Sequence, residues 1–495
     1  MKYKQLNQKH DCWNGDLLEK YDALYQGGHV FRNLANRFLN KNALEPSEVY
    51  QARIRESTYE PFINSIVNQF ASQLFSSPFI VRSNSEELDI FYSEFKEKCN
   101  DNGDDLLTFT RAVFINSLIK GCAWVLTELP NDGEPLPEDL ATYNDKGLGI
   151  VKISTVEAED VFDWEVDDRN NLIWVITHKV DKKRYSPYDT RNTVTETWKI
   201  YDQADVETFQ ISYEANKKPN NDTPIPTLGK ISHRFPKVPF VCLKIPAGLW
   251  LVNRLADAQI EHFRMNNALG WSMRRACYPT AVYKSNSDAI KLNTSNDNFG
   301  IKIGESESFD WISPPVDSFT EIAKRVDQFK NDLHSLAMQM SLSVANGSGA
   351  IKRSGESKKQ DSKSTEIILY AYADVVKAFI EELYELISDA RGDQDIKFSI
   401  EGMNEFTSED SKETLETLQA IKDLNIPMIQ ECEPLQKELA RQIVHVTLPD
   451  LAQNVKDEIS DYITKYKFQP IEAKPIVEVP SKLTPTIPTQ KPAVG

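Results

Sequence analysis

The chain has 495 residues, and its 57 Lys and Arg against 74 Asp and Glu give a formal net charge of −17 at pH 7. A protein that binds nucleic acid over its whole surface would be basic, whereas this chain is acidic. Any contact with DNA must therefore be local. The six cysteines form no C-x-x-C pair, and no apolar run approaches the roughly 18 residues of a membrane span. We therefore expect two to four domains or one large elongated subunit, with reduced thiols, no membrane contact and no secretory signal.

The first 120 residues predict helices. Residues 1–44 are polar with scattered aromatics and indicate short helices in an N-terminal extension. One strong helix is expected after Pro46, with its apolar stripe running from Tyr59 to Leu74 and its end at Ser77-Pro78. A short strand at 79–81 and helices at 86–98 and 104–120 follow, and Gly121 ends the last of these.

Residues 122–243 predict a β-rich segment. Its hairpins are indicated by alternating apolar residues around turns rich in Asp and Asn. The expected strands are 122–128, 149–153, 161–166, 172–177, 193–201, 206–213 and 238–243, with a loop at 215–228.

Long helices dominate the remainder. The expected order is a helix at 249–273, a small insertion with strands at 280–283 and 300–304, and a second long helix from Val316 with a capping box of Ser318 and Glu321. A loop then leads to a third long helix at 364–391, a strand at 395–401 and helices at 409–423 and 433–446. The tail from Pro470 is Pro-rich and predicts no packed structure. The predicted fold class is α+β and predominantly helical.

The loop before the third long helix is basic in an otherwise acidic chain. Between Ala345 and Lys363 it holds five basic side chains against two acidic ones, together with three glycines. The basic residues are Lys352, Arg353, Lys358, Lys359 and Lys363, and the glycines, which would act as hinges, are Gly347, Gly349 and Gly355.

Motifs for catalysis are missing from the sequence. A P-loop requires G-x-x-x-x-G-K-[ST], but five residues separate Gly349 from Gly355, and Glu356 stands where the lysine should be. The seven histidines are far apart and show no paired metal spacing, and there is no G-x-S-x-G. We therefore expect no enzyme activity, no cofactor and no metal.

The order of these elements resembles that of the portal proteins of tailed bacteriophages. YEPFINSIVNQFASQLFSSPFI, from Tyr59 to Ile80, is similar to the family's early helix and the turn after it. Val161–Trp164 with Asp167–Leu172 resembles its wing hairpin. The entry to the family's first stem helix is similar to Val238–Val241, Trp250 and Leu255–Ile260. The family's tunnel loop is similar to Gly347-Ser-Gly349 with the helix at 364–391.

The resemblance covers roughly residues 45–446 and implies a division of the chain. The implied parts are an N-terminal extension (1–44), a wing (45–248), a first stem helix (249–279), a clip (280–315), a second stem helix (316–342), a tunnel loop (343–363), a long helix and strand returning to the wing (364–402), crown-like helices (403–466) and a Pro-rich tail (467–495).

The resemblance also implies a function. Members of the family form a ring, typically of twelve copies, at one vertex of the virion capsid. Double-stranded DNA enters and leaves through the ring during packaging and ejection. The implied partners are the terminase large subunit, the head-tail connector or adaptor that later replaces it, the major capsid protein and the scaffold.

In this interpretation Lys352, Arg353, Lys358, Lys359 and Lys363 face the channel and touch the DNA backbone without reading its sequence. The alternative for the loop is a solvated linker whose charges only keep it soluble. Two alternatives for the whole chain also remain: a capsid-associated or tail-adaptor ring without a DNA channel, and a nucleic-acid-processing enzyme with a hidden site.

Overall fold

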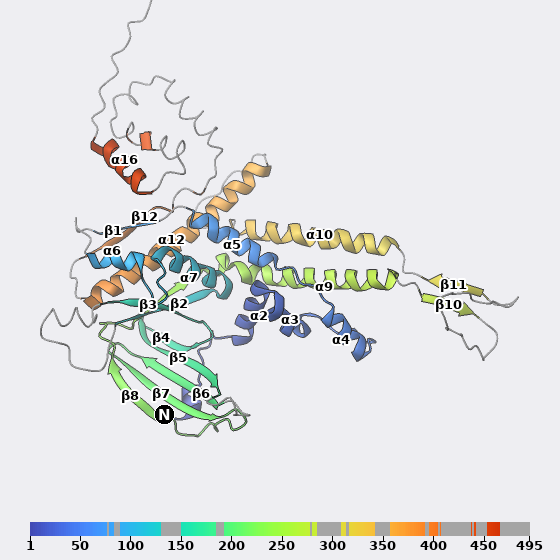
Figure 1. The fold of residues 1–495 in the computed structure, drawn as a ribbon, viewed down its shortest axis with the longest axis horizontal. Coiled ribbons are helices and arrows are strands. Elements are labelled where there is room, and N and C mark those ends of the chain that lie inside the picture. The colour runs from blue at the N-terminus through green and yellow to red at the C-terminus, as the bar shows by residue number, and fades with distance from the viewer. Residues whose placement is uncertain are drawn as a thin grey trace, which may run out of the picture. The chain divides into compact units, whose positions relative to one another are not determined.

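The computed structural model is a mixed α+β protein (Figure 1). It describes residues 1–76, 79–83, 90–129, 150–184, 193–277, 280–284, 308–312, 316–341, 357–391, 396–403, 406, 437, 440–441 and 453–465. The chain divides into two compact units, Met1–Phe406 and Thr407–Gly495. The α+β class expected from the sequence is confirmed.

The first unit holds nearly all of the described elements. Its helices are α1 (Tyr3–Leu6), α2 (Gly15–Gln26), α3 (Gly28–Phe38), α4 (Ser47–Arg55), α5 (Phe62–Leu74), α6 (Ile90–Glu97), α7 (Leu106–Lys120), the 3-10 turn η1 (Ala247–Leu249), α9 (Leu251–Cys277), α10 (Val316–Met338) and α12 (Ser357–Arg391). In the second unit the structure describes α16 (Gln453–Lys465) and three helical residues at 437, 440 and 441.

The strands form antiparallel sheets. Five strands pair in sequence order as β4 (Val161–Val166), β5 (Leu172–Lys183), β6 (Thr193–Tyr201), β7 (Asp205–Glu214) and β8 (Thr227–Ser232). A three-stranded sheet has the order β3 (Lys152–Val156), β2 (Cys122–Glu128) and β9 (Phe240–Lys244). Two-stranded pairs join β1 (Ile80–Ser83) to β12 (Phe398–Glu401), and β10 (Thr280–Lys284) to β11 (Ser308–Ile312).

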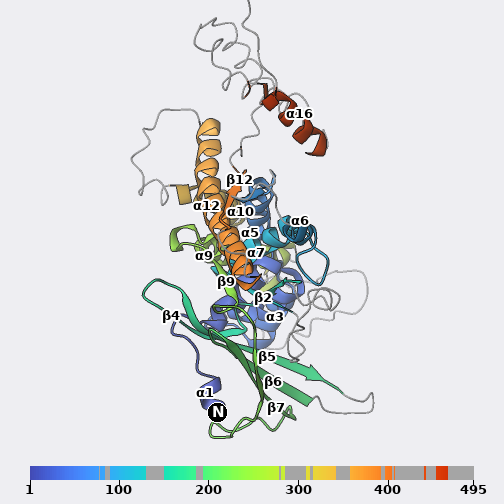
Figure 2. The same cartoon turned by 90° about the vertical axis from the view of Figure 1, so that its left-hand side faces the viewer.

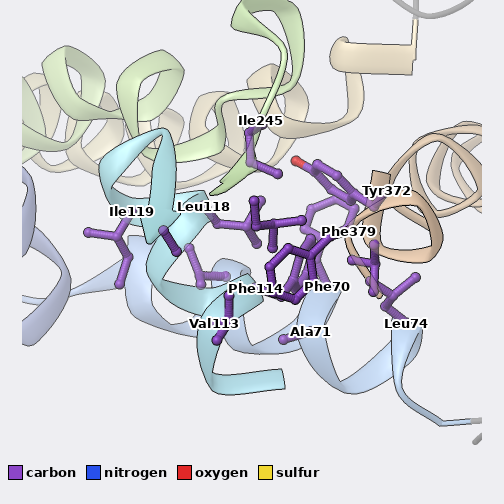
Figure 3. Packing of buried hydrophobic residues seen from close by; sticks show 14 of the residues in the cluster. Phe70, Ala71, Leu74, Val113, Phe114, Leu118, Ile119, Ile245, Tyr372 and Phe379 are labelled. Carbon is purple, nitrogen blue, oxygen red and sulfur yellow. The ribbon is translucent and has the colours of Figure 1, made fainter. Parts of the chain in front are cut away.

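One large apolar core ties helices from distant parts of the chain together. Phe70 on α5, Phe114 on α7 and Tyr372 on α12 are almost fully buried against one another (Figure 3). The Tyr372 hydroxyl donates a hydrogen bond of 2.7 Å to the carbonyl of Leu249, immediately before α9. The third long helix is therefore anchored to the point where the first one begins.

Local chemistry sets the ends of α7. The Asp105 side chain accepts a hydrogen bond of 2.7 Å from the Thr108 amide and caps the first turn. Gly121 ends the helix in the left-handed conformation, with φ at 84°. A Cβ there would lie 2.9 Å from the Trp250 indole, so both the backbone conformation and the packing require glycine.

Some predicted elements differ from the observed ones. The single helix expected after Pro46 is wrong: α4 and α5 are separate, because Pro61 cannot donate a backbone hydrogen bond and disfavours helical geometry at the residue before it. The second long helix begins at Val316, so Ser318 lies inside the first turn and is not its cap. Strands β8 and β11 and helix α16 were not predicted. The strand expected at 300–304 and the helix expected at 409–423 lie outside the described residues.

The N-terminal residues belong to the core. Leu24, Phe31, Ala35 and Phe38 of α2 and α3 are buried in the same cluster as α5, α7 and α9. The Phe31 ring stacks on Tyr59 with ring centroids 3.7 Å apart, and it meets Phe263 of α9 edge-on. Short helices were predicted in this region, but its place in the core was not.

Candidate functional site

The most distinctive feature of the first unit is an arm made of two long helices and a hairpin. Helices α9 and α10 pack side by side, and β10 and β11 pair antiparallel beyond their ends, in register from Thr280↔Ile312 to Lys284↔Ser308 (Figure 1). We call α9, the β10–β11 hairpin and α10 the arm. The expected order of long helix, small insertion and long helix is therefore present.

Burial changes along the arm. Near the body of the unit, Leu251 and Leu255 of α9 and Leu333 and Ala337 of α10 are fully buried. Toward the hairpin Val326 is still buried, but most apolar side chains are only partly covered, and Met273 is 51% exposed. The partly covered ones are Met265, Leu269, Phe319, Ile322 and Phe329. The root of the arm is thus part of the core, whereas its distal half keeps apolar surface on both helices.

The connection from α3 to α5, residues 39–61, holds α9 from the side, and we call it the brace. The buried Arg53 guanidinium pairs with the buried Glu45 carboxylate at 2.8 Å, and the Asn267 side chain donates to the Arg53 carbonyl at 3.3 Å. Arg264 of α9 donates to the carbonyl of Phe38, just before the brace, at 2.8 Å. Charge-assisted bonds of this kind fix the position of the arm on the body.

A polar cluster lies at the root of the arm. His262 of α9 is only 1% exposed, and neither of its ring nitrogens has a hydrogen-bond partner among the described residues. The edge of its ring meets Phe62 of α5, with ring centroids 5.0 Å apart. One turn earlier, Gln259 donates to the Glu60 carbonyl at 2.9 Å, and the Glu60 carboxylate lies 3.7 Å from the Lys330 ammonium of α10. Burial lowers the pKa of His262, so the folded protein favours the neutral ring.

Helix α12 carries part of the predicted basic loop. It begins at Ser357, whereas the sequence analysis expected the helix from 364, so the backbone of Lys358, Lys359 and Lys363 lies in its first two turns. Figure 2 shows this end of α12 projecting past the other helices of the first unit. Lys352, Arg353 and the hinge glycines Gly347, Gly349 and Gly355 lie outside the described residues.

A buried polar network on the five-stranded sheet was not predicted. The Glu196 carboxylate accepts hydrogen bonds from Tyr3 at 3.1 and 3.2 Å and from Tyr213, and lies 3.0 Å from Nε2 of His178. Burial and the neighbouring Glu196 charge raise the pKa of Tyr3 to about 12. The partners are far apart in sequence, and only the alternation along β5, β6 and β7 could have indicated that they share a face. The network fastens α1 to the sheet.

Metal and membrane sites are not indicated in the described part of the chain. No group of three or more His, Cys, Asp or Glu side chains there could hold a metal ion. No described helix is long and apolar enough to cross a membrane.

Comparison with known proteins gives matches among solved structures alone. No family model matches the sequence, and no curated protein matches it. Among solved structures, the chain is similar to one in "Neck of empty GTA particle computed with C6 symmetry", with a TM-score of 0.39 and 10% identity over 80% of this chain and 95% of that one. It is also similar to a chain in "Virion of native gene transfer agent (GTA) particle", with a TM-score of 0.40 and 9% identity over 86% of this chain and 99% of that one. TM-scores of this size do not establish a shared fold.

Proposed function

We propose that the chain is a portal subunit: one copy of a ring at a single vertex of a phage-like capsid, through which double-stranded DNA is packaged and ejected. The observation that carries this proposal is the arm followed by the third long helix. Two antiparallel helices with a hairpin at their far end, and a further helix anchored to the start of the first, match the order of stem, clip, stem and long helix implied by the sequence resemblance.

Ring formation is supported by the distal half of the arm. Helices α9 and α10 both keep partly exposed apolar residues, and they can bury this apolar surface against neighbouring copies. A head-to-tail contact repeated around an axis must close into a ring, because otherwise it grows into a filament. We propose twelve copies, the number typical of the family that the sequence resembles.

Negative-stain imaging of the purified full-length chain tests the proposal. We expect closed rings with a central opening in views along the axis, and a single ring per particle at one vertex when the chain is incorporated into capsids. A stable monomer at micromolar concentration would refute the ring. Rings without an axial opening, or rings found outside the capsid vertex, would instead favour the tail-adaptor interpretation.

DNA contact is proposed for the basic residues at the start of α12 and in the segment before it. A channel for a sliding polyanion should bind phosphates weakly along most of its length, because every firm Lys or Arg contact adds affinity through counterion release. A chain with a net charge of −17 that places five basic residues within twelve positions, from Lys352 to Lys363, suits contact at one level of the channel.

Neutralising these residues tests the DNA contact. Lys352 and Arg353 are changed to Ser, while Lys358, Lys359 and Lys363 are changed to Gln, a good helix former, because α12 includes them. We expect rings of normal stability with altered DNA packaging or retention, and a lower salt dependence of DNA affinity. The control neutralises five exposed lysines elsewhere, namely Lys4, Lys96, Lys98, Lys217 and Lys218. If both variants package and retain DNA alike, the basic segment is only a linker and does not contact DNA.

Partners follow from the same proposal. The hairpin end of the arm would meet the terminase large subunit during packaging and the head-tail connector afterwards, since this end lies farthest from the body of the first unit (Figure 1). Capsid and scaffold proteins would contact the ring at the vertex.

We also propose that the chain is not an enzyme. The buried acid–base group, Glu196 with His178 and two tyrosines, is enclosed between α1 and the sheet. An open depression of about 560 Å³ between α2, α3 and α9 is lined by charges of both signs, and its Lys20 and Asp257 are already paired at 3.3 Å. Nuclease and ATPase assays on purified protein should show no activity above background.

A further inference from the structure

The two ends of strand β5 carry opposite charge. At its start, Glu165 lies near the end of β4, and Asp167 and Asp168 lie in the turn that leads into β5, where Arg169 is the single basic residue. We call these three carboxylates the acidic turn. At the other end of the strand Lys182, Lys183 and Arg184 follow one another, and we call them the basic end. All six side chains are exposed.

The acidic turn is held in one conformation. The Asp167 carboxylate accepts hydrogen bonds of 2.8 Å from the amides of Arg169 and Asn171, and one of 2.9 Å from the Asn171 side chain. Asn170 adopts a positive φ of 66°, which asparagine tolerates well in such turns. Because Asp167 is used internally, Glu165 and Asp168 are the carboxylates that face solvent for an external contact.

The basic end is equally well placed. Lys182 pairs with Val194 and Lys183 with Thr193 in the backbone ladder between β5 and β6, so the strand is still regular where these cations occur. Among the described residues, none of the three cations forms an ion pair, and neither does Glu165 or Asp168. Both patches are therefore available to a partner of opposite charge.

The two patches lie at opposite ends of β5. Strand β5 has 12 residues, so its ends are about 40 Å apart at a rise of about 3.3 Å per residue. Figure 2 shows the β4–β5 turn and the arrowhead of β5 on opposite sides of the five-stranded sheet. The acidic turn and the basic end of one copy therefore cannot meet each other, whereas those of two neighbouring copies can.

We propose that the basic end of β5 in one copy contacts the acidic turn of the next copy around the ring. The inference rests on the proposed function, because a closed ring requires two different and complementary patches on each subunit. Opposite charges at the two ends of one rigid strand meet that requirement. Electrostatic complementarity of this kind speeds encounter, rejects wrong orientations and fixes the register between subunits.

A charge swap tests the contact in the full-length protein. One variant carries Glu165→Lys and Asp168→Lys, a second carries Lys182→Glu and Lys183→Glu, and a third combines all four changes; Asp167 is kept because it holds the turn. Ring assembly is followed by sedimentation and native mass spectrometry at low salt. We expect each of the first two variants to need about tenfold more protein for half-assembly, and the combined variant to assemble like the parent.

Matched controls separate a specific contact from a change in net charge. Lys96→Glu with Lys98→Glu, and Glu94→Lys with Glu97→Lys, make the same charge changes at exposed positions on and just after α6. Neither control should shift assembly. A neutral pair of variants, Glu165→Gln with Asp168→Asn and Lys182→Gln with Lys183→Gln, should each flatten the salt dependence of assembly while melting at the parent's temperature.

The outcomes distinguish this inference from the proposed function. If the parent forms no ring, the proposed function fails. If the parent forms rings and either reversed variant assembles like its control, only the proposed contact is overturned. The contact is also overturned if the basic-end variant fails to assemble and the combined variant does not recover, since the cations must then meet some other surface.

Discussion

His262 shows how a single buried side chain can make the root of the arm sensitive to pH. Its neutral ring packs between α5, α9 and α10, where Glu60, Asp327 and Lys330 are the charged groups near it. The two carboxylates favour protonation and the lysine opposes it, but burial outweighs them and lowers the pKa. In the unfolded chain a histidine has a pKa of about 6.5. Below that pH the unfolded chain therefore takes up a proton before the folded chain does, and acid destabilises the fold.

Replacing His262 with Leu should remove this contribution. We expect the parent to lose free energy of unfolding as the pH falls from 7 to 5, and the variant to lose less by up to about 1.4 kcal/mol per pH unit. Urea unfolding at several pH values measures the difference. His29, which is exposed on α3, serves as the control for a histidine outside the core. Parallel pH curves for the parent and His262→Leu would contradict this prediction, because the His262 imidazole would then have the same pKa in the folded and unfolded chain.

At the scale of elements, α2, α3 and the brace pack against α9 and support it. Helices α2 and α3 lie outside the region of sequence resemblance, yet α3 packs on α9 through Phe31 and Phe263. The brace holds α9 through Arg53 and Asn267. The first helices therefore support the arm as directly as α5 does.

Removal of residues 1–38 should prevent folding of the first unit. The deletion would expose the surface that Leu24, Phe31, Ala35 and Phe38 now cover, and each large apolar side chain contributes about 1.5–3 kcal/mol when fully buried. The sum approaches the net stability of about 5–15 kcal/mol of a typical protein. Circular dichroism and a thermal melt should show no cooperative transition. Deleting 470–495 is the control and should leave the melting temperature unchanged; a cooperative melt after the N-terminal deletion would refute the assigned role.

At the scale of the whole molecule, the order of elements was largely predictable from the sequence, and the tertiary sites were not. Periodic apolar residues marked α7, α9 and α10 to within a few residues but placed the start of α12 at 364 and not at Ser357. Alternation marked β2 and β4–β7. Pro61 was overlooked as a helix break because the apolar pattern resumes directly after it. Strand β8 was missed because its Leu228 and Ile231 are exposed and its Gly229 interrupts the pattern.

The polar sites escaped prediction for a different reason. Strands β5 and β6 place His178 and Glu196 on one face, and α1 brings Tyr3 to that face. No local motif encodes that meeting. In the sequence, His262 and Gln259 are ordinary polar residues of an amphipathic helix. Their burial depends on the packing of α5 and α10, which the local sequence does not show. The predicted tunnel-loop residues were recognised by composition alone. Their contact with DNA stays a prediction for all five, Lys352, Arg353, Lys358, Lys359 and Lys363.

The antiparallel course of α9 and α10 gives the chain freedom to vary at the hairpin. The backbone leaves the body and returns to it at neighbouring places, so a longer or shorter segment between β10 and β11 need not disturb the path of the chain in the core. Doubling the length of such a segment costs only about 0.6 kcal/mol in closure entropy. Lineages could therefore accept insertions at this tip and acquire new docking partners while the fold that carries the arm stays the same.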